Sequence, residues 1–214
     1  MEALFTKFVI ATCITLHLAT FFLVASGHDS ETIFKLLAFS LNNFFLYPHT
    51  VLTSIFFHLE IAHLISNCLA MLFFGSALES EIGTKRTALL FFLGGVIANL
   101  ASALVYGGDV YFLGASGAIF AILGACMLIK PFQFTIYPYL VPLPLGMLAI
   151  IYAIYNAFGA LLGASGVSYV GHLAGMFIGA LYGIGKVGLQ KGLLIILLLM
   201  FIVLLPAFLI LALF

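Results

Sequence analysis

Long apolar runs, separated by short polar breaks, dominate this sequence and restrict what it can fold into. A bilayer span needs about 20 mostly apolar residues, and runs of that kind recur along the chain. Of the 214 residues 65% are hydrophobic and only 7% are charged, whereas a soluble domain carries about 25% charged residues. The mean hydropathy is +1.32. The pattern predicts an all-α polytopic membrane protein, and the zero net charge gives no indication of a nucleic-acid partner.

The polar breaks divide the chain into seven predicted helices and one longer connection, 27–60. That connection is too polar at its start to span a membrane, so we expect a loop with short helices partly in the interface. We interpret the first helix as retained rather than as a signal peptide, because Glu2 precedes it and Lys7 lies within it. We expect a single membrane domain over residues 1–214. The predicted helices are 4–26, 61–78, 85–106, 116–130, 143–163, 168–186 and 192–213.

The basic residues are distributed unevenly between the two sides that these helices define. With the N-terminus in the cytoplasm, six of the seven lysines and arginines fall on the cytoplasmic side and only Lys35 lies outside. Cytoplasmic loops of membrane proteins are enriched in Lys and Arg. We therefore predict seven spans in the cell membrane, a cytoplasmic N-terminus and an extracellular C-terminus. The six predicted cytoplasmic residues are Lys7, Lys85, Arg86, Lys130, Lys186 and Lys191.

With this topology, four polar residues from three predicted helices lie in the outer half of one bundle. Polar groups inside a membrane are costly and face an interior or a cavity. Ser116 begins one helix inside the stretch "GASG", where serine is a favoured cap and where the helix N-terminus suits a developing oxyanion. A serine nucleophile needs a base, and His172 can be that base. His63 and Asn67, spaced i and i+4 on one face, can donate hydrogen bonds to a tetrahedral intermediate.

Each of these residues also has a purely structural interpretation. His63 and Asn67 could form hydrogen bonds between helices, and His172 could bond to a backbone carbonyl. A zinc site formed by His58, His63 and His172 is conceivable, although no spacing in the sequence requires one.

Small residues recur every four positions on two of the predicted helices. Such a pattern lets two helix backbones approach closely. We expect this face of the helix 168–186 to pack on the helix 116–130, which would bring His172 toward Ser116. The small residues are Gly171, Gly175, Gly179 and Gly183 on one helix and Gly117, Ala121 and Ala125 on the other.

Three segments together resemble the rhomboid family of intramembrane serine proteases. They are "HLEIAHLISNCLAMLFFGSALE", "GASGAIFAILGA" and "GHLAGMFIGALYG", and the resemblance extends over about residues 49–183. It implies that Ser116 is the nucleophile and His172 the general base. It also implies that His63, Asn67 and the Ser116 N–H stabilise the oxyanion. Further residues that it implies are Gly114, Gly117 and Phe120, which shape the site, and His58 and Glu79, which are structural.

The resemblance further implies a fold and an activity. The fold is a six-helix core over about residues 4–186, to which the helix 192–213 is appended. The activity is cleavage of single-pass transmembrane proteins within or near their membrane span, through an acyl-enzyme and with no cofactor or metal. Two departures stand out: the chain has no Trp for the Trp-Arg pair common after the first helix, and Phe120 stands where the family often has Tyr. An inactive relative that binds transmembrane helices is the alternative function, and a transporter with a polar midplane site is a more distant one.

Overall fold

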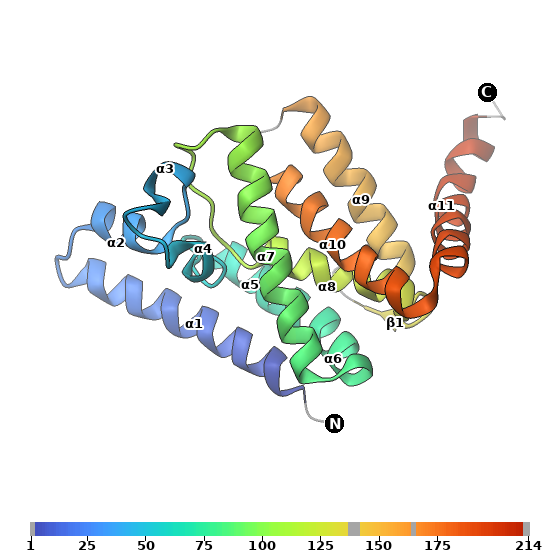
Figure 1. The fold of residues 1–214 in the computed structure, drawn as a ribbon, viewed down its shortest axis with the longest axis horizontal. Helices are drawn as coiled ribbons and strands as arrows, with labels where there is room; N and C mark the ends of the chain where they lie inside the picture. Colours follow the sequence, from blue (N-terminus) through green and yellow to red (C-terminus); the bar gives the residue numbers. More distant parts are fainter. Residues whose placement is uncertain (1–2, 137–141, 164–165, 212–214) are drawn as a thin grey trace.

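The computed structural model describes residues 3–136, 142–163 and 166–211, with side chains up to Pro206. In this part of the chain nearly all regular structure is helical, and the expected all-α polytopic fold is confirmed (Figure 1). The helices are α1 (Leu4–Ala25), α2 (Ser30–Leu37), α3 (Leu41–Phe44), α4 (Thr50–Thr53), α5 (Ile61–Ala70), the π-helical η1 (Met71–Gly75), α6 (Ser76–Ile82), α7 (Thr84–Tyr106), α8 (Ser116–Ile129), α9 (Leu145–Leu162), α10 (Tyr169–Val187) and α11 (Leu189–Leu211).

Six of these helices are long and apolar enough to cross a membrane, if the continuous unit α5–η1–α6 is taken as one. The seventh, α8, has only 14 residues. At 1.5 Å per residue it is about 21 Å long, shorter than the hydrocarbon core of about 30 Å. Its C-terminal end is tied to the surface, because Lys130 forms an ion pair with the half-exposed Glu81 at 3.3 Å. Ser116 begins the opposite, N-terminal end of α8.

The short helix α8 is the centre of the core, surrounded by α7, α9 and α10 (Figure 1). Ten of its 14 residues are buried and the other four are half-buried, as expected of a helix that is apolar all round. The predicted packing on α10 is confirmed: a side chain at Gly175 or Gly179 would collide with the α8 backbone. Gly117 was expected to pack on α10, but a side chain at this position would point at the Ala98 side chain of α7. Only the Gly117 carbonyl faces Gly175 of α10.

The connection 27–60 contains the expected short helices, α2, α3 and α4. The middle of this connection forms backbone hydrogen bonds with the segment that precedes α8. Phe39 and Phe112 exchange backbone hydrogen bonds of 2.9 and 2.7 Å. Further along, the Gly114 N–H donates to the Ser54 carbonyl at 2.8 Å. This connection therefore holds the loop that leads into Ser116.

The helix predicted at 61–78 extends to Ile82 and contains a π-helical turn, η1, that the apolar pattern did not reveal. Beyond this turn the buried Glu79 carboxylate reaches the N-terminus of α1. It accepts hydrogen bonds from the N–H groups of Phe5 and Thr6 at 2.8 and 2.9 Å, and from the hydroxyls of Thr6 and Thr84. Because α1 has no capping side chain of its own, Glu79 satisfies donors that would otherwise be unpaired.

The helix α9 is fixed at its beginning by neighbouring backbone and by α11. The Leu145 N–H donates to the Gln133 carbonyl at 2.8 Å and the Gly146 N–H to the Pro131 carbonyl at 3.0 Å. A two-residue hairpin, β1 (Phe134–Thr135) with β2 (Leu143–Pro144), lies just before this point. The fully buried Leu199 of α11 packs where Gly146 has no side chain.

Candidate active site

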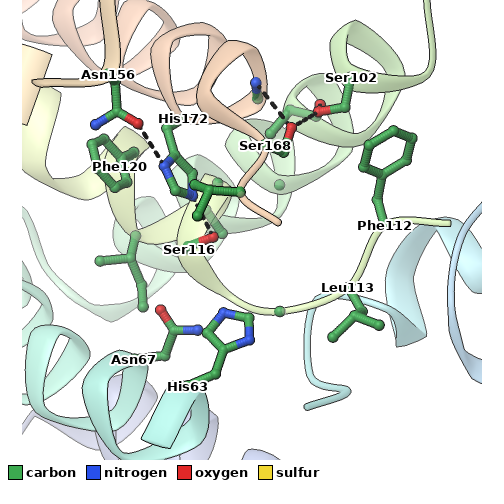
Figure 2. Close-up of a pocket in the computed structure, with 18 of the residues that line it drawn as sticks. His63, Asn67, Ser102, Phe112, Leu113, Ser116, Phe120, Asn156, Ser168 and His172 are labelled. Carbon is green, nitrogen blue, oxygen red and sulfur yellow. Dashed lines mark hydrogen bonds between the residues drawn. The ribbon is translucent and has the colours of Figure 1, made fainter. Parts of the chain in front are cut away.

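A cavity of about 940 Å³ opens among α5, α7, α8, α9 and α10. The four polar residues singled out in the sequence, Ser116, His172, His63 and Asn67, all line it (Figure 2). Its wall combines apolar side chains with a few polar groups, which is the usual character of a ligand-binding site. The structure therefore brings together residues that are as much as 109 positions apart, from His63 to His172, in one concave site.

Ser116 is the first residue of α8 and follows a bend of the backbone at Gly114. Gly114 has a φ of +103°, which favours glycine, and a side chain there would lie 2.6 Å from the His63 ring. The Ile119 N–H already donates to the Ala115 carbonyl, so the helix begins at once after this bend. The Ser116 hydroxyl therefore projects from a helix N-terminus, where the potential is positive.

His172 of α10 connects the serine to a third side chain. Its Nε2 lies 2.7 Å from Ser116 Oγ, and its Nδ1 lies 2.8 Å from Asn156 Oδ1 of α9. Figure 2 shows the three side chains in one line, from Asn156 through His172 to Ser116. The Phe120 ring is stacked on the imidazole, with a centroid distance of 4.3 Å and an angle of 5° between the planes. Phe120, one turn after Ser116, therefore provides a flat apolar surface behind the histidine.

Asn156 is the site residue that sequence reasoning missed. It is fully buried, and its Nδ2 donates to the Tyr152 carbonyl at 2.8 Å. Its partner lies 16 residues further on in another helix, so no spacing within one helix connects the two. The available signal was a single asparagine in the apolar run "AIIYAIYNAFGALL", because a polar residue inside a membrane helix is costly.

His63 and Asn67 lie on the other side of the 112–116 loop from His172 (Figure 2). Asn67 is buried, and one N–H of its amide donates to His58 Nε2 at 2.9 Å. Within the described part of the chain the His63 ring has no hydrogen-bond partner, and it packs edge-to-face on the His58 ring at 5.0 Å. The two side chains expected to stabilise an oxyanion thus line the cavity, and the hydrogen bond to His58 fixes the Asn67 amide.

The residue behind Asn67 is His58, which is fully buried. Its Nδ1 donates to the Phe56 carbonyl at 3.0 Å, which leaves Nε2 as an acceptor for Asn67 and, at 3.4 Å, for the Ala115 N–H. Burial, and to a smaller extent the neighbouring His63, lowers the pKa of His58 from its ordinary 6.5 to about 4. His58 is therefore neutral near pH 7, as its two accepted hydrogen bonds require.

A second polar group in the cavity wall fixes the start of α10. The Ser168 hydroxyl accepts the Gly171 N–H at 3.3 Å as an N-cap and lies 2.5 Å from Ser102 Oγ of α7. Ser102 in turn donates to the Ala98 carbonyl. The first turn of α10, from which His172 projects, is therefore attached to α7.

The three histidines weighed as a zinc site do not form one. Among the described residues, no three His, Cys, Asp or Glu side chains come together as metal ligands would. His172 already has both ring nitrogens engaged, by Ser116 and Asn156.

Comparison with known proteins gives consistent matches. A model of the rhomboid domain matches residues 47–189. Rhomboid protease GluP of Bacillus subtilis is 31% identical over 188 residues, covering 83% of this chain and 34% of that protein. RHOMBOID-like protein 4 of Arabidopsis thaliana is 32% identical over 121 residues (56% and 30%), and mitochondrial Rhomboid protein 1 of Saccharomyces cerevisiae is 31% identical over 144 residues (63% and 40%). The chain thus spans well under half the length of each relative.

Proposed function

The chain belongs to the rhomboid family, and on that premise we propose that it is an intramembrane serine endopeptidase with a Ser116–His172 dyad. The observation that carries the proposal is the 2.7 Å contact between Ser116 Oγ and His172 Nε2 in the wall of the large cavity. A serine hydroxyl is a weak nucleophile until a neighbouring base takes its proton, and this contact supplies that base. We also propose that the chain is one membrane domain, with its core at about 4–186 and a further helix at about 192–213.

In the first half-reaction, Ser116 Oγ attacks a peptide carbonyl of the substrate and its proton passes to His172 Nε2. The tetrahedral intermediate then expels the amine, which takes that proton as the C–N bond breaks. In the second half-reaction, water gives a proton to His172 Nε2 and attacks the acyl carbon. The Ser116–acyl bond breaks and Oγ takes the proton back, so serine and histidine end as they began. No cofactor takes part in these steps.

The developing oxyanion needs hydrogen-bond donors that point at the carbonyl oxygen as it becomes negatively charged. Three groups beside Ser116 can supply them: its own backbone N–H, the His63 ring and the second N–H of the Asn67 amide. We expect Asn67→Ala to lower kcat about 10²–10³-fold, the usual cost of one oxyanion donor.

The proposed substrate is a single-pass transmembrane protein that reaches the site from the bilayer. Because α8 is short, Ser116 lies within the thickness of the membrane, where a spanning substrate also lies. Hydrolysis needs water, and unpaired substrate backbone at that depth is tolerated only in a wet cavity. We therefore propose that a substrate segment unwinds into the 940 Å³ cavity, which opens to the extracellular side.

A fluorophosphonate probe tests the proposal in the purified chain, together with cleavage of a single-pass substrate in liposomes. We expect the probe to label Ser116, and we expect Ser116→Ala and His172→Ala to lose detectable labelling and cleavage. Loss of the base removes a factor of about 10²–10⁴. Cleavage at the wild-type rate by Ser116→Ala would refute the assignment. A chain that binds transmembrane peptides but is neither labelled nor active would instead be an inactive family member.

A further inference from the structure

We infer that Asn156 of α9 is the positioning residue that orients the His172 base toward Ser116. The inference rests on the proposed function and adds a third member to its dyad. Ser116, His172 and Asn156 come from three different helices, α8, α10 and α9. The base is therefore aligned from a helix that carries neither the base nor the nucleophile (Figure 2).

The direction of the Asn156 amide is settled by its second contact. Its Nδ2 donates to the Tyr152 carbonyl, which can only accept, so Oδ1 is the atom that faces His172. Oδ1 can only accept, and the ring nitrogen at 2.8 Å from it, Nδ1, must therefore carry the proton. A neutral imidazole with its proton on Nδ1 has a lone pair on Nε2, and Nε2 is the atom 2.7 Å from the serine hydroxyl. The chain of contacts thus selects the one neutral tautomer that can act as a base.

Asn156 and Phe120 constrain the imidazole in different ways. The stacked Phe120 ring fixes the plane of the imidazole, but the ring could still flip within that plane. The hydrogen bond to Asn156 removes this freedom, because a flipped ring would place a carbon against the buried Oδ1. An unpaired buried acceptor costs about 1–3 kcal/mol. Asn156 is fully buried in the folded chain, so its side chain has no exposed surface at which solvent could compete for the bond to His172.

An amide suits this position because the third group need only accept a hydrogen bond from the Nδ1–H of His172. It does so without adding a charge to an apolar bundle, where an ionised carboxylate would be expensive. Among known nucleophile–histidine arrangements, an asparagine can replace the aspartate as the orienting group.

Because Asn156 belongs to α9, the orientation of the His172 ring depends on the position of α9 relative to α10. The beginning of α9 is held by backbone hydrogen bonds at Leu145 and Gly146, whereas Leu161 and Leu162 at its end are 83% and 80% exposed. Asn156 lies between these two regions. A displacement of the exposed end away from α10 would therefore break the Asn156–His172 bond and release the base from its working orientation.

Kinetics of three variants test the inference. Asn156→Ala should lower kcat at least tenfold, up to the whole general-base contribution of about 10⁴, with little change in KM, since Asn156 touches the base and not the substrate. Asn156→Asp keeps an acceptor oxygen and should recover part of that loss. The matched control is Ile150→Ala, which removes a buried apolar side chain from the same helix and should lower stability without this loss of kcat. An unchanged kcat in Asn156→Ala would overturn the inference.

A second measurement decides the inference without needing activity. In ¹⁵N-histidine-labelled Ser116→Ala protein, no serine hydroxyl competes for His172, so its tautomer depends on Asn156 alone. We expect a protonated Nδ1 and an unprotonated Nε2 in the nitrogen NMR spectrum, assigned by comparison with His172→Gln. Removing Asn156 as well should give a mixture of tautomers. A protonated Nε2 with Asn156 in place would overturn the inference. Failure of the probe to label the wild-type chain would count against the proposed function alone.

Discussion

At the scale of single residues, the site depends on side chains that hold other side chains in place. His58 fixes Asn67, Asn156 fixes His172, and Phe120 fixes the plane of the imidazole. The sequence pattern predicted a site of Ser116, His172, His63 and Asn67 from local signals, "GASG", "HLISN" and the glycine-rich helix, and the four residues line one cavity. It could not identify Asn156, because its role depends on how α9 is turned against α10, and no local pattern records that rotation.

Replacement of Gly114 should disturb the loop that leads into Ser116. Gly114→Ala would adopt an unfavourable positive φ, which costs about 1–3 kcal/mol, and its Cβ would collide with the His63 ring. We expect slower fluorophosphonate labelling of Ser116, measured as a rate. Gly27→Ala is the control, because Gly27 has a φ of +91° but open space around it. Equal labelling rates in the two variants would contradict a role for the Gly114–His63 contact.

His58 predicts a dependence of stability on pH. Its pKa is about 4 in the folded chain and 6.5 when unperturbed, so the unfolded chain binds the proton more readily. Its contribution to stability is therefore complete above pH 6.5 and is lost as the pH falls toward 4, by up to about 3 kcal/mol. Thermal unfolding in detergent between pH 4 and 7 should show this loss, and His58→Gln should reduce it. His28→Gln, at an exposed histidine, is the control. An identical pH dependence in His58→Gln and in the wild type would contradict the assignment.

At the scale of helices, the sequence predicted elements better than it predicted their details. Within the described residues, the apolar runs located the six helices that are long enough to cross a membrane and the shorter α8, because length and hydropathy are properties of a continuous segment. The π-helical turn η1 was missed, since one extra residue in a turn leaves the apolar pattern unchanged. The capping of α1 by Glu79 was missed as well, because it joins residues 74 positions apart.

The contact between α8 and α10 can be tested on α10 alone. Gly179→Ala would place a Cβ against the Ala121 carbonyl of α8, and overpacking of this kind costs about 1–3 kcal/mol or more. We expect a lower unfolding temperature and slower labelling of Ser116, since the helices that carry Ser116 and His172 would move apart. Gly185→Ala, in the same helix but facing open space, should be neutral or stabilising by about 0.5–1 kcal/mol. Similar effects of both substitutions would contradict the proposed close packing.

At the scale of the whole molecule, the basic residues gather at one end of the bundle. The N-terminus, the α6–α7 turn and the α10–α11 turn lie at the same end in Figure 1. Basic residues occupy these segments in the sequence: Lys7 in the first turn of α1, Lys85 and Arg86 in the first turn of α7, and Lys186 and Lys191 on either side of the α10–α11 turn. Such an end is typically cytoplasmic. The sequence predicted basic residues at one end of the bundle, because the order of the spans decides at which end each connecting segment lies. The position of α11 against the start of α9 could not be predicted, since apolar helices carry little information about their partners.

The predicted orientation can be measured by labelling single cysteines in a chain without its natural ones. In intact cells, a membrane-impermeant maleimide should label Asp109→Cys, between α7 and α8, because this position is predicted to be extracellular. Lys186→Cys, at the end of α10, should be labelled only after permeabilisation. Both native residues are exposed, so access to the reagent is comparable. The reverse pattern would contradict the predicted topology.

The distribution of Ser116, Asn156 and His172 over three helices has a consequence for biosynthesis. The ribosome makes the serine first, and 56 residues must follow before the histidine exists. During that interval α8 can enter the membrane with its nucleophile but without a base. On the proposed mechanism the nascent chain therefore cannot cleave neighbouring proteins in the insertion machinery. It becomes a protease only when α10 has joined the bundle, so completion of the fold is itself the activation step.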